Sequence, residues 1–355
     1  MSYADYSRKR RILTGITLLV VAALAAVEAF FPASPVAEIV RIVDTSYVSS
    51  VLRLTVPIAF AALGGIFAEK SGVINIGLEG LLIISAFTSV AVAATIGGGD
   101  PTQLQLWLGF GVAVLASVLF ALLFAVVCIE FKADQIIAGL AVWLIALGLA
   151  PFASKVIWGQ VNSPPVSTLN NWTIPLLSEI PVVGSVLFDA NPPVYMLLAS
   201  VVASWYVLNR TAYGRWIESS GENPKALDTV GVDVRKVRYS GVLISGLFSG
   251  IGGAGLALGR VGQFIGGGTT MINGRGWIGI TAYLFGNYNP LGAFGASFLF
   301  ASLDALQIRL QQIGYNIPSE LIGIIPYVTV IVVLALVGRT RIPSAAGEHY
   351  ESGEE

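Results

Sequence analysis

Residues 104–129 read LQLWLGFGVAVLASVLFALLFAVVCI and contain no charged side chain. A helix needs about 20 consecutive apolar residues to cross the hydrocarbon core of a bilayer. Across the whole chain, 12% of the residues are charged, whereas about 25% is usual in soluble domains. The stretch therefore predicts a membrane-spanning helix, and the composition predicts an integral membrane protein.

Similar apolar segments recur along the chain and predict an all-α, polytopic membrane protein with about ten transmembrane helices. Residues 1–338 are expected to form a single transmembrane domain. The segment Gly276–Gly286 is short for a crossing, so eight or nine spans remain alternatives. The ten predicted spans are Ile12–Phe31, Val48–Ala68, Val73–Ile96, Leu104–Ile129, Gln135–Trp158, Val194–Leu208, Tyr239–Gly259, Gly276–Gly286, Leu291–Leu310 and Glu320–Val337.

Positive charge predicts the orientation, because cytoplasmic loops of membrane proteins are enriched in Lys and Arg. With alternating spans, both termini are expected in the cytoplasm of a cell-membrane protein. The segment 155–193 is then external and should cap the outer face, and the acidic tail 339–355 should be disordered. The basic residues on the predicted cytoplasmic side are Arg8, Lys9, Arg10, Arg11, Lys70, Lys132, Arg210, Arg215, Lys225, Arg235, Lys236, Arg238, Arg339 and Arg341.

A polar break follows the second predicted span, where Asn75 and Glu79 stand among glycines. Irregular backbone at membrane depth is tolerated only inside protein or along a water-filled cavity. One hypothesis is a broken helix that lines a substrate pathway, with Asn75 able to donate and accept hydrogen bonds. The alternative is a cytoplasmic turn in which Glu79 caps a helix N-terminus.

A second break covers residues 260–277 and is too rich in glycine for a stable helix. Its candidate pathway residues are Gln263, Asn273, Arg275 and Trp277, which offer hydrogen bonds and an aromatic face. A flexible outer loop is the alternative. Both breaks follow a Gly-Gly pair, so the two halves are candidates for inverted repeats, although glycines placed independently for helix packing explain the pattern equally well.

The loop 209–238 between the sixth and seventh predicted spans contains a short helix, Pro224–Val230. Asn223 suits the N-cap, Pro224 the first helical position and Gly231 the position after the helix. A helix this short needs its own protein or a partner groove to hold it. The candidate coupling residues are Gly221, Glu222, Asn223, Pro224, Ala226, Leu227, Val230 and Gly231, and the alternative is a capped connecting loop.

Three motifs resemble one family of transport proteins. The sequence GENPKALDTVGV at residues 221–232 resembles the cytoplasmic coupling loop of ABC permeases of the simple-sugar and nucleoside importer type. GVINIGLEG at 72–80 is similar to a second hallmark, and GRGWI at 274–278 followed by FGNYNPLG at 285–292 to a third. The resemblance extends from about Leu52 to Val337, and the second permease of nucleoside systems is the most similar type.

The resemblance implies a heteromeric transporter. Its expected partners are an ABC ATPase, a sister permease that forms a heterodimer with this chain, an extracytoplasmic solute-binding protein and the lipid bilayer. The sequence has no Gly-x-x-x-x-Gly-Lys-Ser/Thr phosphate loop. We therefore expect a transport subunit that is not an enzyme and binds no cofactor, with ATP-Mg hydrolysed on the partner ATPase.

Other classes of protein fit the sequence less well. An ion-coupled secondary transporter is the main alternative, but its usual buried acids are here scattered at Glu28, Glu79, Asp304 and Glu320. A membrane enzyme lacks a plausible catalytic cluster, and the single histidine, His349, offers no metal site. A net charge of −1 does not indicate nucleic-acid binding. Nucleosides and sugars both remain open as cargo.

Overall fold

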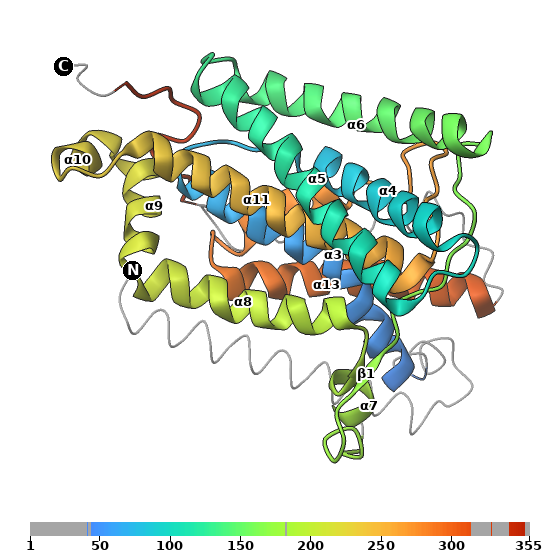
Figure 1. Ribbon diagram of the computed structural model, residues 1–355. Helices are drawn as coiled ribbons and strands as arrows, with labels where there is room; N and C mark the ends of the chain where they lie inside the picture. Colours follow the sequence, from blue (N-terminus) through green and yellow to red (C-terminus); the bar gives the residue numbers. More distant parts are fainter. Residues whose placement is uncertain (1–40, 42–43, 182, 314–327, 329–340, 352–355) are drawn as a thin grey trace.

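The computed structural model describes residues 41, 44–181, 183–313, 328 and 341–351 (Figure 1). Within this part of the chain, helices run side by side as one elongated bundle. The elements are α3 (Thr45–Lys70), α4 (Leu78–Gly97), α5 (Gln103–Ile129), α6 (Gln135–Trp158), β1 (Trp172–Thr173), α7 (Val183–Leu187), β2 (Asp189–Ala190), α8 (Pro192–Arg210), α9 (Ala212–Glu222), α10 (Pro224–Thr229), α11 (Val234–Leu256), η1 (Ala257–Val261), α12 (Arg275–Phe285) and α13 (Pro290–Ile313).

Seven helices of the described residues are long and apolar enough to cross a membrane. They are α3, α4, α5, α6, α8, α11 with its π-helical extension η1, and α13. The polytopic all-α prediction is therefore confirmed. The eighth predicted span is α12, which has 11 residues. The first and tenth predicted spans lie outside the described residues, apart from residue 328.

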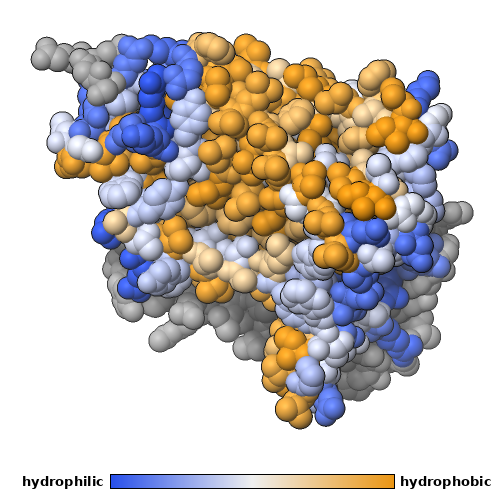
Figure 2. Space-filling model, in the orientation of Figure 1, coloured by the Kyte–Doolittle hydropathy of each residue, from blue (hydrophilic) through white to orange (hydrophobic). Residues whose placement is uncertain are grey.

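Burial separates the central helices from the peripheral ones. The apolar window of α3 is 94% buried, and that of α6 is only 28% buried. Figure 2 shows the consequence on one face: a broad hydrophobic band across the middle of the bundle, with hydrophilic residues gathered toward its ends. Exposed leucines and isoleucines on α5 and α6 belong to this band, as expected of helices whose outer sides contact lipid.

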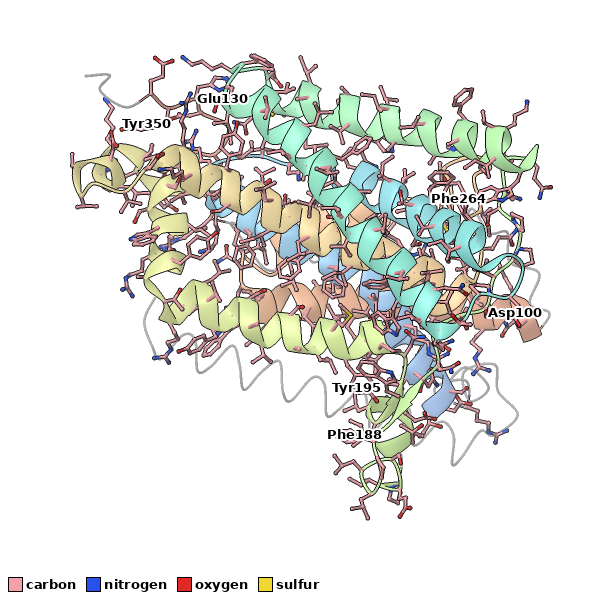
Figure 3. The ribbon with its side chains drawn as sticks, in the orientation of Figure 1. Asp100, Glu130, Phe188, Tyr195, Phe264 and Tyr350 are labelled. Carbon is pink, nitrogen blue, oxygen red and sulfur yellow. The ribbon has the colours of Figure 1, made fainter. Side chains whose placement is uncertain are left out.

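The ends of the described bundle carry different segments. The coupling end holds the C-terminus of α3, the loop between α5 and α6, helices α9 and α10, and residues 341–351. The far end holds the start of α3, the start of α5 and residues 159–191. In Figure 3, Glu130 and Tyr350 lie at the coupling end, whereas Asp100 and Phe264 lie at the far end.

Two expectations about backbone structure need correction. The third predicted span begins at Val73, but α4 begins only at Leu78. The intervening backbone cannot continue α3, because Gly72 has a φ of +98° and the Ile74 amide donates to the Gln135 side chain at 2.7 Å. The tail, expected to be disordered over 339–355, is hydrogen-bonded to the bundle where it is described, over 341–351. Its backbone amides find acceptors there that composition does not reveal.

Candidate functional site

The two breaks meet inside the bundle. Residues 73–77 lead into α4, and residues 262–274 lead into α12, so both helices begin beside an irregular segment. The N-terminus of α12 lies against that of α4: a Cβ built on Gly276 would come within 2.5 Å of the Glu79 backbone nitrogen. Only a residue without a side chain permits this approach.

Glu79 joins the two helix starts. Its Oε1 accepts a hydrogen bond from the Gly274 amide at 2.8 Å, and its Oε2 accepts one from the Gly276 amide at 2.6 Å. The side chain is buried, with 2% of its surface exposed. A carboxyl group is favoured there because helix N-termini carry unpaired amides and partial positive charge. Glu79 thus caps a helix from the other half of the chain, while its role in a pathway stays a prediction.

Asn75 fixes the backbone ahead of α4. Its side-chain nitrogen donates to Ser245 Oγ on α11 at 2.9 Å, and its Oδ1 accepts from the Gly77 amide at 3.0 Å. Because the residue is 2% exposed, both functional groups are used within the protein. Asn75 and Glu79 therefore hold the first break against α11 and α12.

A second buried acid secures the opposite end of α12. Glu69, in the last turn of α3, accepts hydrogen bonds from the hydroxyls of Tyr283 at 2.7 Å and Tyr288 at 2.5 Å. Tyr283 lies on α12, and Tyr288 follows it. The short helix is thus held by one carboxyl group near each end. Sequence reasoning missed this cluster, because nothing in the chain links an acid to tyrosines more than 200 residues away.

Arg275, the first residue of α12, lies in a region with excess positive charge. Its guanidinium donates to the Met271 and Ile272 carbonyls at 3.2 and 3.0 Å and lies 3.5 Å from the Asp304 carboxylate. Arg260 is within electrostatic reach of Arg53, Arg275 and Asp304. Among the described residues, Arg260 Nη1 and Arg275 Nε are buried without a hydrogen-bond partner. Glu79 also interacts electrostatically with Arg275, so among the described residues three arginines lie near two acids, Asp304 and Glu79.

The remaining predicted pathway residues are more dispersed. Trp277 lies with Arg275 on α12, and its ring meets Trp143 of α6 edge to face at 5.6 Å. Gln263 instead donates to the Ser163 carbonyl at 2.7 Å, and exposed Asn273 accepts from Thr269 at 2.9 Å. The fold therefore brings Glu79, Arg275 and Trp277 together and bonds Asn75 to α11, whereas Gln263 pairs with Ser163 and Asn273 with Thr269.

The predicted coupling helix forms as α10, one residue shorter than expected. The Asn223 side chain caps it by accepting from the Ala226 amide at 3.1 Å, and Gly231 follows with a φ of +80°. Residues three apart on a helix share a face, but Leu227 is 3% exposed and Val230 is 72% exposed. The two differ because α10 ends at Thr229, so Val230 does not follow helical periodicity.

The residues ahead of α10 contact the first break directly. The Ser220 hydroxyl donates to the Ser71 carbonyl at 2.7 Å. Gly221 packs so closely that an added Cβ would lie 2.4 Å from the Lys70 carbonyl oxygen. Glu222, Lys225 and Ala226 are exposed. The loop and the junction between α3 and α4 are therefore in direct contact.

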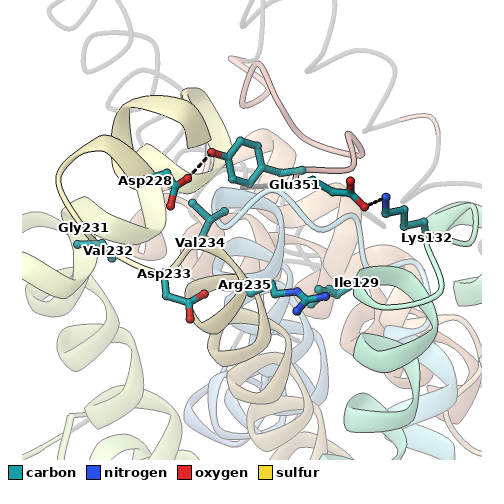
Figure 4. Close-up of a pocket in the computed structure, with 10 residues that line it drawn as sticks. Ile129, Lys132, Asp228, Gly231, Val232, Asp233, Val234, Arg235 and Glu351 are labelled. Atoms are coloured by element: carbon teal, nitrogen blue, oxygen red, sulfur yellow. Dashed lines mark hydrogen bonds and ion pairs between the residues drawn. The ribbon is translucent and has the colours of Figure 1, made fainter. Parts of the chain in front are cut away.

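A polar cavity of about 590 Å³ lies beside α10 (Figure 4). Asp228, Asp233, Arg235, Tyr350 and Lys132 contribute to its lining. The hydrogen bond from the Lys236 backbone amide is the main cause that lowers the pKa of Asp233, the N-cap of α11. Burial, followed by the hydrogen bond to Asp228, raises the pKa of Tyr350. The cavity thus presents the Asp233 side chain beside the Tyr350 phenol.

Comparisons with known proteins agree on one family. Residues 47–334 match the family described as a branched-chain amino acid transport system permease component. The chain is 37% identical over 311 residues to the nucleoside ABC transporter permease protein NupC of Lactococcus lactis, covering 85% of this chain and 96% of that protein. It is also 37% identical over 326 residues to the guanosine ABC transporter permease protein NupQ of Bacillus subtilis, covering 89% and 99%.

A third relative has a different named cargo. The putative glucose ABC transporter permease protein TsgC13 of Haloferax volcanii is 31% identical over 337 residues, covering 86% of this chain and 98% of that protein. No solved structure matches the chain. Because the family match spans most of the sequence and these relatives align along nearly their whole length, the chain belongs to this permease family and is a membrane-spanning permease subunit of an ABC transporter.

Proposed function

We propose that this chain forms one half of a translocation pathway for nucleosides and is driven by ATP hydrolysis on a separate ATPase subunit. The observation that carries the proposal is the 37% identity, along nearly their full length, to permeases named for nucleosides and guanosine. The absence of a phosphate loop from the full sequence supports hydrolysis on another chain.

The site supports an uncharged, aromatic cargo. Trp143 and Trp277 offer aromatic surface close to the α12 start, and purine rings stack well on aromatic side chains. The cluster of Arg53, Arg260 and Arg275 around Asp304 disfavours cationic solutes, as positive charge does in other membrane pathways. A simple sugar is the second candidate cargo, because one relative is named for glucose.

We place the coupling end, with α10, in the cytoplasm, where an ATPase would reach it, and we propose that both termini lie there too. The positive charges of Lys132, Arg215, Lys225, Arg235 and Lys236 at this end support that orientation. A second, more distant guanosine permease protein of the same Bacillus strain, NupP, also matches this chain. It supports a heterodimer with a sister permease, served by a solute-binding protein at the far end.

Reconstitution tests this function. The chain is co-expressed with its candidate ATPase and sister permease, placed in liposomes and supplied with its solute-binding protein. We expect labelled guanosine to accumulate only with ATP and binding protein, and excess unlabelled guanosine to block uptake more strongly than glucose. Stronger block by glucose would indicate the sugar cargo. Uptake that does not depend on ATP but is abolished by an uncoupler would contradict the proposal and would indicate an ion-coupled transporter.

Val230→Asp tests coupling at the exposed end of α10. Val230 is 72% exposed, so the free energy of unfolding should change by no more than about 0.5 kcal/mol. A charge placed in an apolar groove of the ATPase should still weaken docking by about 2 kcal/mol, or roughly thirtyfold. ATPase retention on the purified permease measures the effect.

The matched control for this coupling test is Leu176→Asp. Leu176 is 81% exposed at the far end of the bundle, so its variant should retain the ATPase fully. Equal retention of the ATPase by both variants would contradict docking at α10. Leu227→Asp is unsuitable here, because Leu227 is buried and a charge there would unfold its surroundings.

A further inference from the structure

The C-terminal residues 341–351, called here the strap, cross the coupling end of the bundle (Figures 1 and 4). The strap is mainly irregular in structure, yet its bonds reach segments from across the chain. Its partners are Asn287, Glu222, Gly221, Gly72, Arg238, Asp228 and Lys132.

One set of contacts joins the strap to both sides of α10. The Ala345 amide donates to the Gly221 carbonyl at 2.7 Å, and the Ser344 hydroxyl donates to the Glu222 carboxylate at 2.9 Å. On the other side, the Tyr350 hydroxyl donates to the Asp228 carboxylate at 2.9 Å (Figure 4). Since a helix of this length is unstable alone, these bonds help to fix its position.

A second set joins the strap to the break before α4 and to the turn after α12. The Gly347 amide donates to the Gly72 carbonyl at 3.1 Å, at the start of the break before α4. The Arg341 amide donates to Asn287 Oδ1 at 3.0 Å, in the turn after α12. Gly347 has a φ of +83°, and an added Cβ would lie 3.0 Å from the Ile74 side chain, so glycine suits this close approach.

The remaining contacts anchor the strap to neighbouring helices. The buried Arg238 guanidinium, on α11, donates to the Glu348 carbonyl at 2.6 Å. Glu351 pairs with Lys132 in the loop between α5 and α6, where Figure 4 shows the pair at the edge of the cavity. The strap is thus bonded at several points to segments that are far apart in sequence.

We propose that the strap is a coupling element, which transmits displacement of α10 both to the break before α4 and to the turn after α12. This inference rests on the proposed function, because it assumes that an ATPase displaces α10. The loop ahead of α10 already contacts Ser71 directly. The strap adds a second link on that side and, through Asn287, a link to α12. Residues 341–351 therefore act as positioning residues, away from the cargo.

The test uses the complete transporter in liposomes and compares two truncations of this chain. Removing residues 341–355 deletes the strap, whereas removing residues 352–355 leaves every contact described above in place. For the strap deletion we expect ATP hydrolysis to persist while the number of cargo molecules imported per ATP falls at least about fivefold, because several hydrogen bonds are lost. An unchanged ratio would overturn the proposal.

A double variant, Ser344→Ala with Tyr350→Phe, covers the case in which the strap deletion fails to assemble. It removes both side-chain bonds to the coupling loop and keeps the backbone contacts. We expect about a threefold fall in the same ratio, since two hydrogen bonds are lost, with thermal stability near that of the parent. A parental ratio in this assembled variant would also overturn the proposal.

Amide hydrogen exchange tests the role of the strap independently of the identity of the cargo. In the parent complex, ATP should change exchange at both 224–229 and 71–77. In the double variant the change at 224–229 should remain, and that at 71–77 should shrink by at least half. Equal changes at 71–77 in both proteins would overturn the strap proposal, whereas a parent complex that hydrolyses ATP but imports no nucleoside would overturn only the proposed cargo.

Discussion

Glu79→Gln is expected to lower cargo uptake about tenfold, since the loss of one buried hydrogen bond costs about 1–3 kcal/mol. Both oxygens of Glu79 accept from backbone amides of the α12 start. A glutamine side chain has only one accepting oxygen, so its amino group would face an N–H donor. Uptake in liposomes measures the loss of transport, and thermal unfolding in detergent measures the cost of the lost hydrogen bond.

Glu69→Gln is the matched control for Glu79→Gln. Glu69 is also a buried glutamate, but its partners are the Tyr283 and Tyr288 hydroxyls. Hydroxyl groups can donate or accept, so they can reorient around a glutamine, and we expect a loss of less than about 1 kcal/mol. Equal losses of stability in both variants would contradict the capping role of Glu79. Lost uptake with unchanged stability would instead support direct contact between Glu79 and the cargo.

Gly276→Ala is the second substitution with a large expected effect. Its methyl group would lie 2.5 and 2.6 Å from the backbone nitrogen and Cα of Glu79. Backbone atoms cannot rotate away as a side chain can, so the α12 start must move off α4. We expect the free energy of unfolding to fall by about 1–3 kcal/mol and uptake to fall with it, as measured by thermal unfolding and transport.

Gly295→Ala provides the comparison for Gly276→Ala. Gly295 lies within α13, and none of the described residues approaches within 4 Å of an added Cβ. Alanine favours a helix over glycine by up to about 1 kcal/mol, so this variant should be as stable as the parent or more stable. If Gly276→Ala were as stable as Gly295→Ala, that result would contradict the close contact between the starts of α4 and α12.

Much of the fold follows from local sequence. Apolar length located α3, α5, α6, α8 and α13 to within a few residues at each end, because helix hydrogen bonds join residues four apart and burial in lipid depends on composition. The capping residue Asn223 and the first-turn Pro224 likewise predicted the start of α10, since both act on the adjacent turn. The sequence could also show that residues 73–77 and 262–274 interrupt the helices.

The partners of those interruptions required the tertiary structure. Glu79 bonds to amides about 195 residues away in the chain, and Glu69 bonds to tyrosines more than 200 residues away. These pairs exist because α3, α4, α11 and α12 pack at particular positions relative to one another. Each position depends on all the neighbouring helices, so no local sequence pattern predicts it.

The opening stretch, residues 104–129, shows the same division. Its sequence alone determined that α5 is a membrane-spanning helix, because an uncharged apolar run of that length is stable in a bilayer. The tertiary structure decided which of its sides meets protein: Phe124 is buried, whereas Leu123 is half exposed. It likewise decided that the polar tail is bonded to the bundle, because backbone amides bind wherever folding brings a carbonyl within reach.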